Sequence, residues 1–259
     1  MSVTRASFLR SIATAGLCLL PGILAAEEVT VAVAANFLSP VRALEPGFEA
    51  DSGHDLVITS GSTGQLYAQI VNGAPFDVLL AADQERPRRL ADEGAADAAS
   101  VFTYAVGRLA LWSAEPERIR DLPLAELLAG EFRWFAIAEP AVAPYGAAAQ
   151  QVLEGLGAWG SVQSRLVRGQ NIAQTFAMVA TGNADWGLVA LSQALAYDGP
   201  ASYQVVPQVL HDPIRQDAVL MNRASDNPAA LAWLEYLKSA EGRATIERFG
   251  YAVSEDEAH

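Results

Sequence analysis

Short apolar runs alternate with longer amphipathic segments along most of this chain. The runs have the length and β-branched content of buried strands, whereas the intervening segments carry apolar residues three and four positions apart, as helices do. The predicted strands are 29–34, 56–58, 76–80, 104–112, 135–138, 166–167, 186–191, 203–206 and 218–221. Strands that alternate with helices at this spacing predict an α/β protein with mostly parallel sheets.

Four of the turns between a strand and the next helix share one composition. In each of them a strand ends, a small or polar residue follows, and a helical pattern begins. These turns centre on Asn36, on the pair Ser62 and Thr63, on Tyr145 and on Ile172. Ligands of open α/β sheets lie outside the carboxyl ends of the strands, so the four turns are candidates for one shared site.

The chemistry of these turns favours an anion. The first backbone N–H groups of a helix have no intrahelical partner, and that end of the helix dipole is positive. The side chains add an amide at Asn36, hydroxyls at Ser62 and Thr63 and a phenol at Tyr145, whereas Ile172 can contribute only its backbone N–H. Because every group donates and none is charged, the predicted ligand is an oxyanion that carries no proton near neutral pH.

Length and charge narrow the function further. The chain has 259 residues, of which 51% are hydrophobic, enough for one large domain or two lobes of about a hundred residues each. Its formal net charge of −13 argues against nucleic acid or an anionic membrane surface as a partner. An anion must therefore be bound by local dipoles and hydroxyls.

Residues 1–26 have the features of a signal peptide. Arg5 and Arg10 form a short basic start, Ile12 to Leu24 is mostly apolar, and two alanines precede the predicted cleavage point. The apolar run is too short and too often broken by glycine and proline to predict a membrane span. We therefore expect an exported, periplasmic protein that is not inserted in the membrane after cleavage.

A few residues of the signal peptide indicate the export route and the cysteine content of the mature chain. Ala6 stands where a twin-arginine signal needs its second arginine, and Leu17 precedes Cys18 where a lipoprotein signal has a small residue, so a Sec-type signal is favoured. Cys18 is the only cysteine, so the mature chain has no disulfide and no catalytic thiol. Loss of the two arginines takes the net charge to −15.

Several motifs occur in a characteristic order. They are Ala34-Ala35-Asn36-Phe37, residues 61–70, residues 72–78 followed by Ala81-Ala82-Asp83, Pro144-Tyr145-Gly146, residues 169–174, residues 181–187, and the end from Trp233 to Tyr251. The ordered set, which covers essentially the whole mature chain, resembles the periplasmic molybdate-binding proteins that serve as receptors of molybdate ABC importers.

This resemblance implies a type II periplasmic binding protein. Two lobes, each a mostly parallel sheet flanked by helices, would be joined by two crossover strands and would close on a tetrahedral oxyanion. The first lobe would hold residues 27–107 and 217–259, and the second residues 108–216. The resemblance also implies a membrane permease as partner, no cofactor, and a monomer.

The same resemblance implies the ligand contacts. They would be Asn36 and a hydroxyl of Ser62 or Thr63 from the first lobe, with Tyr145 and the backbone N–H of Ile172 from the second. A gapless count places Thr63 where the family has its ligand hydroxyl, with Ser62 beside it. The ligand would be molybdate or tungstate, which match in charge and nearly in size.

Other functions remain open at this stage. A receptor for another oxyanion such as sulfate is the nearest alternative; phosphate fits less well, because its proton calls for an acceptor carboxylate that the four turns lack. An exported serine hydrolase would use Ser62 with His54 or His211, but Gly61-Ser62-Thr63-Gly64 is not the G-x-S-x-G elbow. The three histidines are scattered and no cysteine survives export, so no metal site is predicted.

Overall fold

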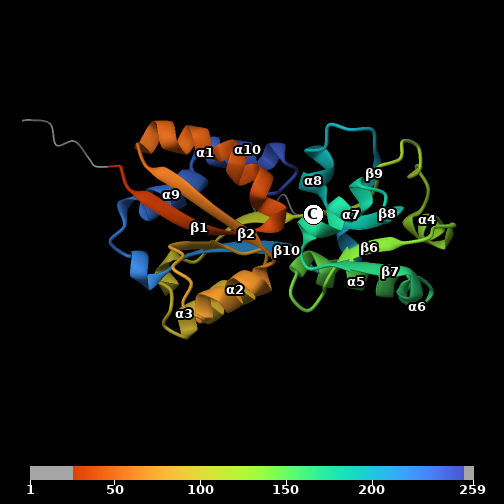
Figure 1. The fold of residues 1–259 in the computed structure, drawn as a ribbon, viewed down its shortest axis with the longest axis horizontal. Helices are drawn as coiled ribbons and strands as arrows, with labels where there is room; N and C mark the ends of the chain where they lie inside the picture. Colours follow the sequence, from red (N-terminus) through yellow and green to blue (C-terminus); the bar gives the residue numbers. More distant parts are fainter. Residues whose placement is uncertain (1–25, 254–259) are drawn as a thin grey trace, which may run out of the picture.

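The computed structural model describes residues 26–253, which form two lobes placed side by side (Figure 1). The predicted signal peptide lies outside the described residues except for its last alanine. Each lobe contains one five-stranded sheet with helices on both faces. The predicted α/β fold, with two lobes that each hold a mostly parallel sheet flanked by helices, is confirmed.

The first sheet has the strand order β2-β1-β3-β10-β4. Its strands are β1 (Glu28–Ala34), β2 (Asp55–Gly61), β3 (Val78–Leu80), β4 (Phe102–Gly107) and β10 (Ile214–Leu220). Strands β2, β1 and β3 are parallel, whereas β10 runs antiparallel to both of its neighbours.

The second sheet repeats this plan with the order β7-β6-β8-β5-β9. Its strands are β5 (Leu109–Ser113), β6 (Phe135–Ala138), β7 (Leu166–Gly169), β8 (Trp186–Ala190) and β9 (Ser202–Val205). Strands β7, β6 and β8 are parallel, and β5 runs antiparallel to β8 and β9.

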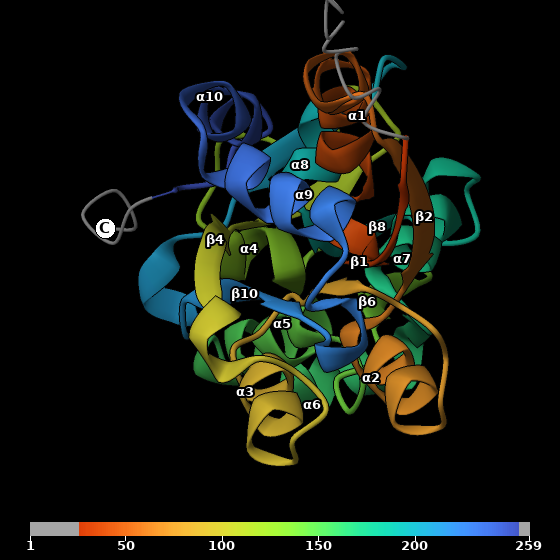
Figure 2. The same cartoon turned by 90° about the vertical axis from the view of Figure 1, so that its left-hand side faces the viewer.

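Alternate residues of the first sheet enter two separate cores. Val31 and Val33 pack under one layer of helices, while Ala32 packs under the other, because successive side chains of a strand point to opposite faces. Figure 2 shows α1, α9 and α10 on one side of β1 and β10, and α2 and α3 on the other. The helical elements of this lobe are η1 (Ala35–Phe37), α1 (Leu38–Ser52), α2 (Thr63–Val71), α3 (Glu85–Asp92), η2 (Ala98–Ser100), η5 (Asn222–Ala224), α9 (Pro228–Lys238) and α10 (Ala240–Arg248).

The second sheet is covered in the same way. Apolar residues of α5 pack against one face, and residues of α7 and α8 pack with Trp112 against the other. The helical elements are α4 (Leu124–Ala129), α5 (Pro144–Gly155), α6 (Trp159–Val162), η3 (Gln163–Arg165), α7 (Ile172–Ala180), α8 (Leu191–Leu195) and η4 (Gln208–Leu210). Within residues 26–253, no helix is both long and apolar enough to span a bilayer.

The chain passes between the lobes twice. The single strand predicted over 104–112 is two strands, β4 in the first sheet and β5 in the second, with only Arg108 between them. The return lies between β9 and β10. The lobe boundary expected at Asp217 falls inside β10, and we propose that the first lobe resumes at Ile214.

Candidate functional site

Four parallel strands direct their carboxyl ends toward the junction of the lobes. Strands β1 and β2 of the first lobe lead into η1 and α2, and β6 and β7 of the second lead toward α5 and α7. The five residues predicted from the sequence lie at the starts of these helices. All five are between 1% and 3% exposed: Asn36, Ser62, Thr63, Tyr145 and Ile172.

Ser62 and Thr63 present hydroxyl protons at the start of α2. Ser62 caps the helix, because its Oγ accepts the Gln65 N–H (3.3 Å) and the Gln65 side chain accepts the Ser62 N–H (3.3 Å). The Thr63 Oγ1 accepts the backbone N–H of Ala82 (2.9 Å). Since each hydroxyl oxygen is already an acceptor, the proton of each remains available to donate.

Asn36 is placed differently from the expectation. Its side-chain amide donates to Gln216 Oε1 (2.8 Å) and to the Tyr251 hydroxyl (3.0 Å), so both amide protons are used within the protein. The donor that this turn retains for a ligand is the backbone N–H at the start of η1. Asn36 therefore lines the site, but the N–H groups of its side-chain amide bind Gln216 and Tyr251 behind the pocket.

The second lobe supplies a phenol and a helix start. Tyr145 lies in the first turn of α5, and its hydroxyl oxygen accepts an N–H of Gln216 Nε2 (3.3 Å). Burial, with the neighbouring Tyr251, raises the pKa of the Tyr145 hydroxyl well above its usual value, so the phenol keeps its proton. Ile172 is the first residue of α7, which Asn171 caps by accepting the Gln174 N–H (2.9 Å).

One small pocket joins these groups. Its lining is drawn from both lobes and carries no charged side chain: Ala34, Ala35, Asn36, Ser62, Thr63, Ala82, Ala143, Pro144, Tyr145 and Ile172. The lobes meet directly beside it, where the Gly64 N–H donates to the Val142 carbonyl (3.0 Å). The pocket can thus surround a small anion with N–H and O–H donors from two sides.

Asp83 is the carboxylate nearest in sequence to the pocket lining, and it binds Arg86. Asp83 comes directly after Ala82 and lines the wider groove next to the pocket. Its side chain accepts the Arg86 backbone N–H (3.0 Å) and pairs with the Arg86 guanidinium. Asp83 is therefore occupied at the start of α3, so the pocket is left without an acceptor carboxylate.

The geometry gives the hydrolase alternative no support. His54 precedes β2 and Ser62 follows it, so a seven-residue strand, roughly 20 Å long, separates them. His211 lies after η4 with its ring against the Asp212 carbonyl (2.7 Å), and burial lowers its pKa. Neither histidine forms a hydrogen bond with Ser62. Within residues 26–253, no cluster of histidine, cysteine or acidic residues could hold a metal ion.

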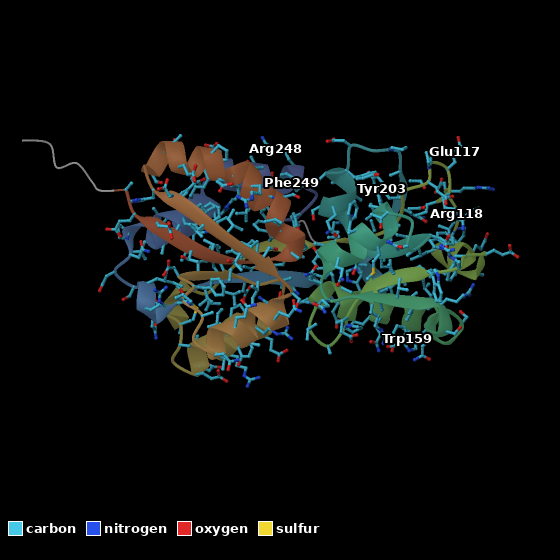
Figure 3. The ribbon with its side chains drawn as sticks, viewed as in Figure 1. Glu117, Arg118, Trp159, Tyr203, Arg248 and Phe249 are labelled. Carbon is cyan, nitrogen blue, oxygen red and sulfur yellow. The ribbon has the colours of Figure 1, made fainter. Side chains whose placement is uncertain are left out.

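A second hollow collects arginines at the far end of the second lobe. It is lined by Arg118, Glu131, Phe132, Arg133 and Arg165, and Figure 3 shows Arg118 there beside Glu117, away from the first lobe. The Arg118 guanidinium donates to the Glu131 carbonyl (2.9 Å), and that of Arg165 donates to the Phe132 carbonyl (3.1 Å). Both also lie over aromatic rings. These two cations stabilise the local loops, so the pocket between the lobes is the better anion site.

Four polar residues behind the pocket were not predicted from the sequence. Gln216, Tyr251, Tyr104 and Ser192 are buried and form hydrogen bonds with Asn36, with Tyr145 or with one another. Gln216 could not be recognised as a buried residue, because Arg215-Gln216-Asp217 is a polar run typical of a loop. In the structure this run continues β10, with a bulge between Gln216 and Asp217.

We expect Thr63→Val to weaken anion binding about tenfold, because it removes one donor while keeping the shape of the side chain. It also leaves the buried Ala82 N–H without its partner, so a lower melting temperature should accompany the loss. Titration calorimetry and thermal unfolding would measure both. Thr181→Val is the matched control, since that exposed hydroxyl bonds to Ala177 on α7. Equal affinities of Thr63→Val and the control would remove the Thr63 hydroxyl from the site.

Relatives of this chain are known from sequence and structure. Residues 29–252 match the family of bacterial extracellular solute-binding proteins. The molybdate-binding protein ModA of Azotobacter vinelandii is 49% identical over 231 residues, which make up 88% of this chain and 91% of that protein. ModA of Rhodobacter capsulatus is 44% identical over 229 residues, or 88% and 90%. The solved structure of the Azotobacter vinelandii periplasmic molybdate-binding protein superposes with a TM-score of 0.82 at 38% identity, covering 88% of this chain and 100% of that one.

Proposed function

Because this chain belongs to the bacterial extracellular solute-binding proteins, and among them to the molybdate-binding proteins, we propose that it captures molybdate in the pocket between its lobes. The chain is a solute-binding protein of a transport system and not an enzyme. In this proposal the ion is held by the Ser62, Thr63 and Tyr145 hydroxyls and by backbone N–H groups at Asn36 and Ile172.

One observation carries the proposal. Two lobes bring four helix starts and the hydroxyl-bearing residues Ser62, Thr63 and Tyr145 to a single pocket whose lining has no charged side chain. A doubly negative oxyanion without a proton satisfies such donors fully, whereas a protonated anion would bring its own donor to a site that offers no carboxylate acceptor. This favours molybdate over phosphate. Tungstate has the same charge and nearly the same size, so we propose that it binds as well.

We propose that the protein takes part in the import of the ion. The signal peptide over residues 1–26 would direct the chain to the periplasm, where it would act as a monomer. The loaded, closed form would dock on the permease of an ABC importer and release the ion there. Closure around the ion is supported by the hydrogen bonds that join the lobes next to the pocket, Gly64 to Val142 and Ser192 Oγ to the Asn36 carbonyl (3.0 Å).

Calorimetric titration with molybdate, tungstate, sulfate and phosphate tests the proposal. We expect molybdate and tungstate to bind at least a hundredfold more tightly than phosphate, since one unpaired buried donor or acceptor costs about 1–3 kcal/mol and more than one would be affected. Tight binding of sulfate with none of molybdate would assign the protein to another oxyanion.

The phenol is tested separately with Tyr145→Phe. We expect molybdate affinity to fall about ten- to a hundredfold, which is the effect of losing one donor to a buried anion. Tyr203→Phe is the matched control, because Tyr203 is 44% exposed, lies on the second lobe (Figure 3) and is not among the residues that line the pocket. An unchanged dissociation constant for Tyr145→Phe would take this residue out of the site.

A further inference from the structure

Two carboxylates of the first lobe lie close to the pocket. Asp83 follows the pocket residue Ala82 directly in the chain and lines the groove that adjoins the pocket. Asp217 lies in β10 and is 1% exposed. The two residues are neighbours, because the Asp217 N–H donates to the Asp83 carbonyl (3.2 Å). Two negative charges are therefore placed next to the proposed site of an anion.

The charges of both carboxylates act on residues behind the pocket. Besides burial, which has the largest effect, the charges of Asp217 and Asp83 raise the pKa of the Tyr104 hydroxyl. That hydroxyl lies 3.2 Å from Gln216 Oε1, and the same oxygen accepts an N–H of Asn36 (2.8 Å), which lines the pocket. An anion in the pocket would therefore be repelled by the two carboxylates if no cation balanced them.

Helix α3 places two arginines against these carboxylates. The Arg86 guanidinium pairs with Asp83 Oδ2, while Asp83 Oδ1 accepts the Arg86 backbone N–H (3.0 Å). Arg88 lies farther from its partner, with Nη2 3.7 Å from Asp217 Oδ2. The Arg86 side chain is 22% exposed and that of Arg88 is 60% exposed, so water screens the Arg86 pair less. Arg86 is therefore the cation with the stronger effect on its carboxylate.

Asp83 depends on Arg86 more than Asp217 depends on any single partner. Burial raises the pKa of the Asp83 carboxyl, whereas the hydrogen bonds and the charge of Arg86 lower it and so favour the ionised form. Asp217 also accepts hydrogen bonds from Gln84 (3.0 Å) and Thr103 (2.6 Å). The chain has a net charge of −13, so there is no general excess of cations to offset either carboxylate.

We propose that Arg86 raises the affinity of the pocket for a dianion by cancelling the charge of Asp83. Arg86 is not among the residues that line the pocket, so it would act through Asp83 and not by contact with the ion. The inference rests on the function proposed above. It explains how an acidic protein holds a doubly charged oxyanion in a pocket whose lining has no cation.

Substitutions of the two partners should change the affinity in opposite directions. Arg86→Gln leaves the Asp83 charge unbalanced, so we expect molybdate affinity to fall about tenfold. Asp83→Asn removes the negative charge but keeps the shape and an acceptor for the Arg86 N–H, so affinity should rise about threefold or more. If the pair had a merely structural role, both variants would weaken binding, because each breaks the same ion pair. Calorimetric titration at pH 8, well above the usual pKa of a carboxyl, measures both effects.

Three further variants serve as controls. Arg86→Lys keeps the charge and should keep the affinity within about threefold of wild type. Arg89→Gln removes the same charge from the same helix, but Arg89 pairs with the exposed Glu93 (2.8 Å), so affinity should change about twofold at most. The double variant, Asp83→Asn with Arg86→Gln, should bind molybdate nearly as wild type does, because both charges are removed together.

Thermal unfolding of each variant shows whether it is folded. If Arg86→Gln did not fold, Asp83→Asn alone would decide, since tighter binding supports the inference and equal or weaker binding contradicts it. Weaker binding in both single variants, or a loss in Arg89→Gln as large as that in Arg86→Gln, would overturn this inference and leave molybdate as the ligand. Failure of wild type to bind molybdate would overturn the proposed function and this inference with it.

Discussion

Gly107→Ala should weaken molybdate binding about a hundredfold, although residue 107 does not line the pocket. Gly107 ends β4, and a Cβ at this position would collide with the Tyr145 hydroxyl and lie 2.7 Å from Gln216 Nε2. Both side chains are buried and hydrogen bonded to each other, so neither can move without losing its partner. We therefore expect the Tyr145 ring to be displaced, which would change the wall of the pocket that Tyr145 forms.

Calorimetry with molybdate would measure the loss, and circular dichroism and thermal unfolding would show whether the variant remains folded. Overpacking of this kind lowers the free energy of unfolding by about 1–3 kcal/mol. Gly155→Ala is the matched control, because a Cβ there meets nothing within 4 Å and lies in α5, the helix that carries Tyr145. If Gly107→Ala bound molybdate as tightly as this control, the close packing of Gly107 on Tyr145 would have no part in the site.

The free energy of unfolding should fall steeply above about pH 10. Burial raises the pKa of Tyr251 to about 12, and those of Tyr104 and Tyr145 well above the usual 10.0. In the unfolded chain these phenols ionise near pH 10, whereas the folded protein keeps their protons. The unfolded state then binds fewer protons, so the stabilising contribution, complete below pH 10, is lost as the pH rises toward the folded values. Three groups together predict a slope of about 4 kcal/mol per pH unit.

Denaturant unfolding at a series of alkaline pH values would measure that slope. Tyr251→Phe removes one of the three groups and should reduce the slope by about a third. Tyr236 also has a pKa raised to about 12, but it is only partly buried, so solvent screening reduces its contribution. Tyr236→Phe therefore serves as the comparison, and it should reduce the slope less than Tyr251→Phe does. A slope for Tyr251→Phe equal to that of wild type would show that the Tyr251 phenol does not keep its proton in the folded state.

The location of the site could be predicted because it depends on local patterns. Each of the four turns carries its own strand, its own polar or small residue and its own helix start, and the rule that parallel strands end at one edge brings them together. Asn36, Thr63 and Tyr145 were found in this way, and all line the same pocket. The capping box that starts α2 is also a local feature, because it needs only Ser62 and, three residues later, Gln65.

The use of the Asn36 amide could not be predicted, since it is decided by partners distant in the sequence. Gln216 and Tyr251 lie 180 and 215 residues away, and nothing near Asn36 indicates that they will take both of its amide protons. Gln216 itself was hidden in a polar run that resembles a loop. The lobe boundary was expected between residues 107 and 108, but the run over 104–112 was predicted as one strand, because only the assembly of two sheets divides it into β4 and β5.

The hydrogen bond from Gly64 to Val142 joins the lobes directly at the pocket. Because the pocket walls come from both halves of the molecule, parting of the halves would break that bond and separate the two sets of donors. We therefore expect the residence time of a bound ion to depend on how often the halves part, in addition to its contacts with each half.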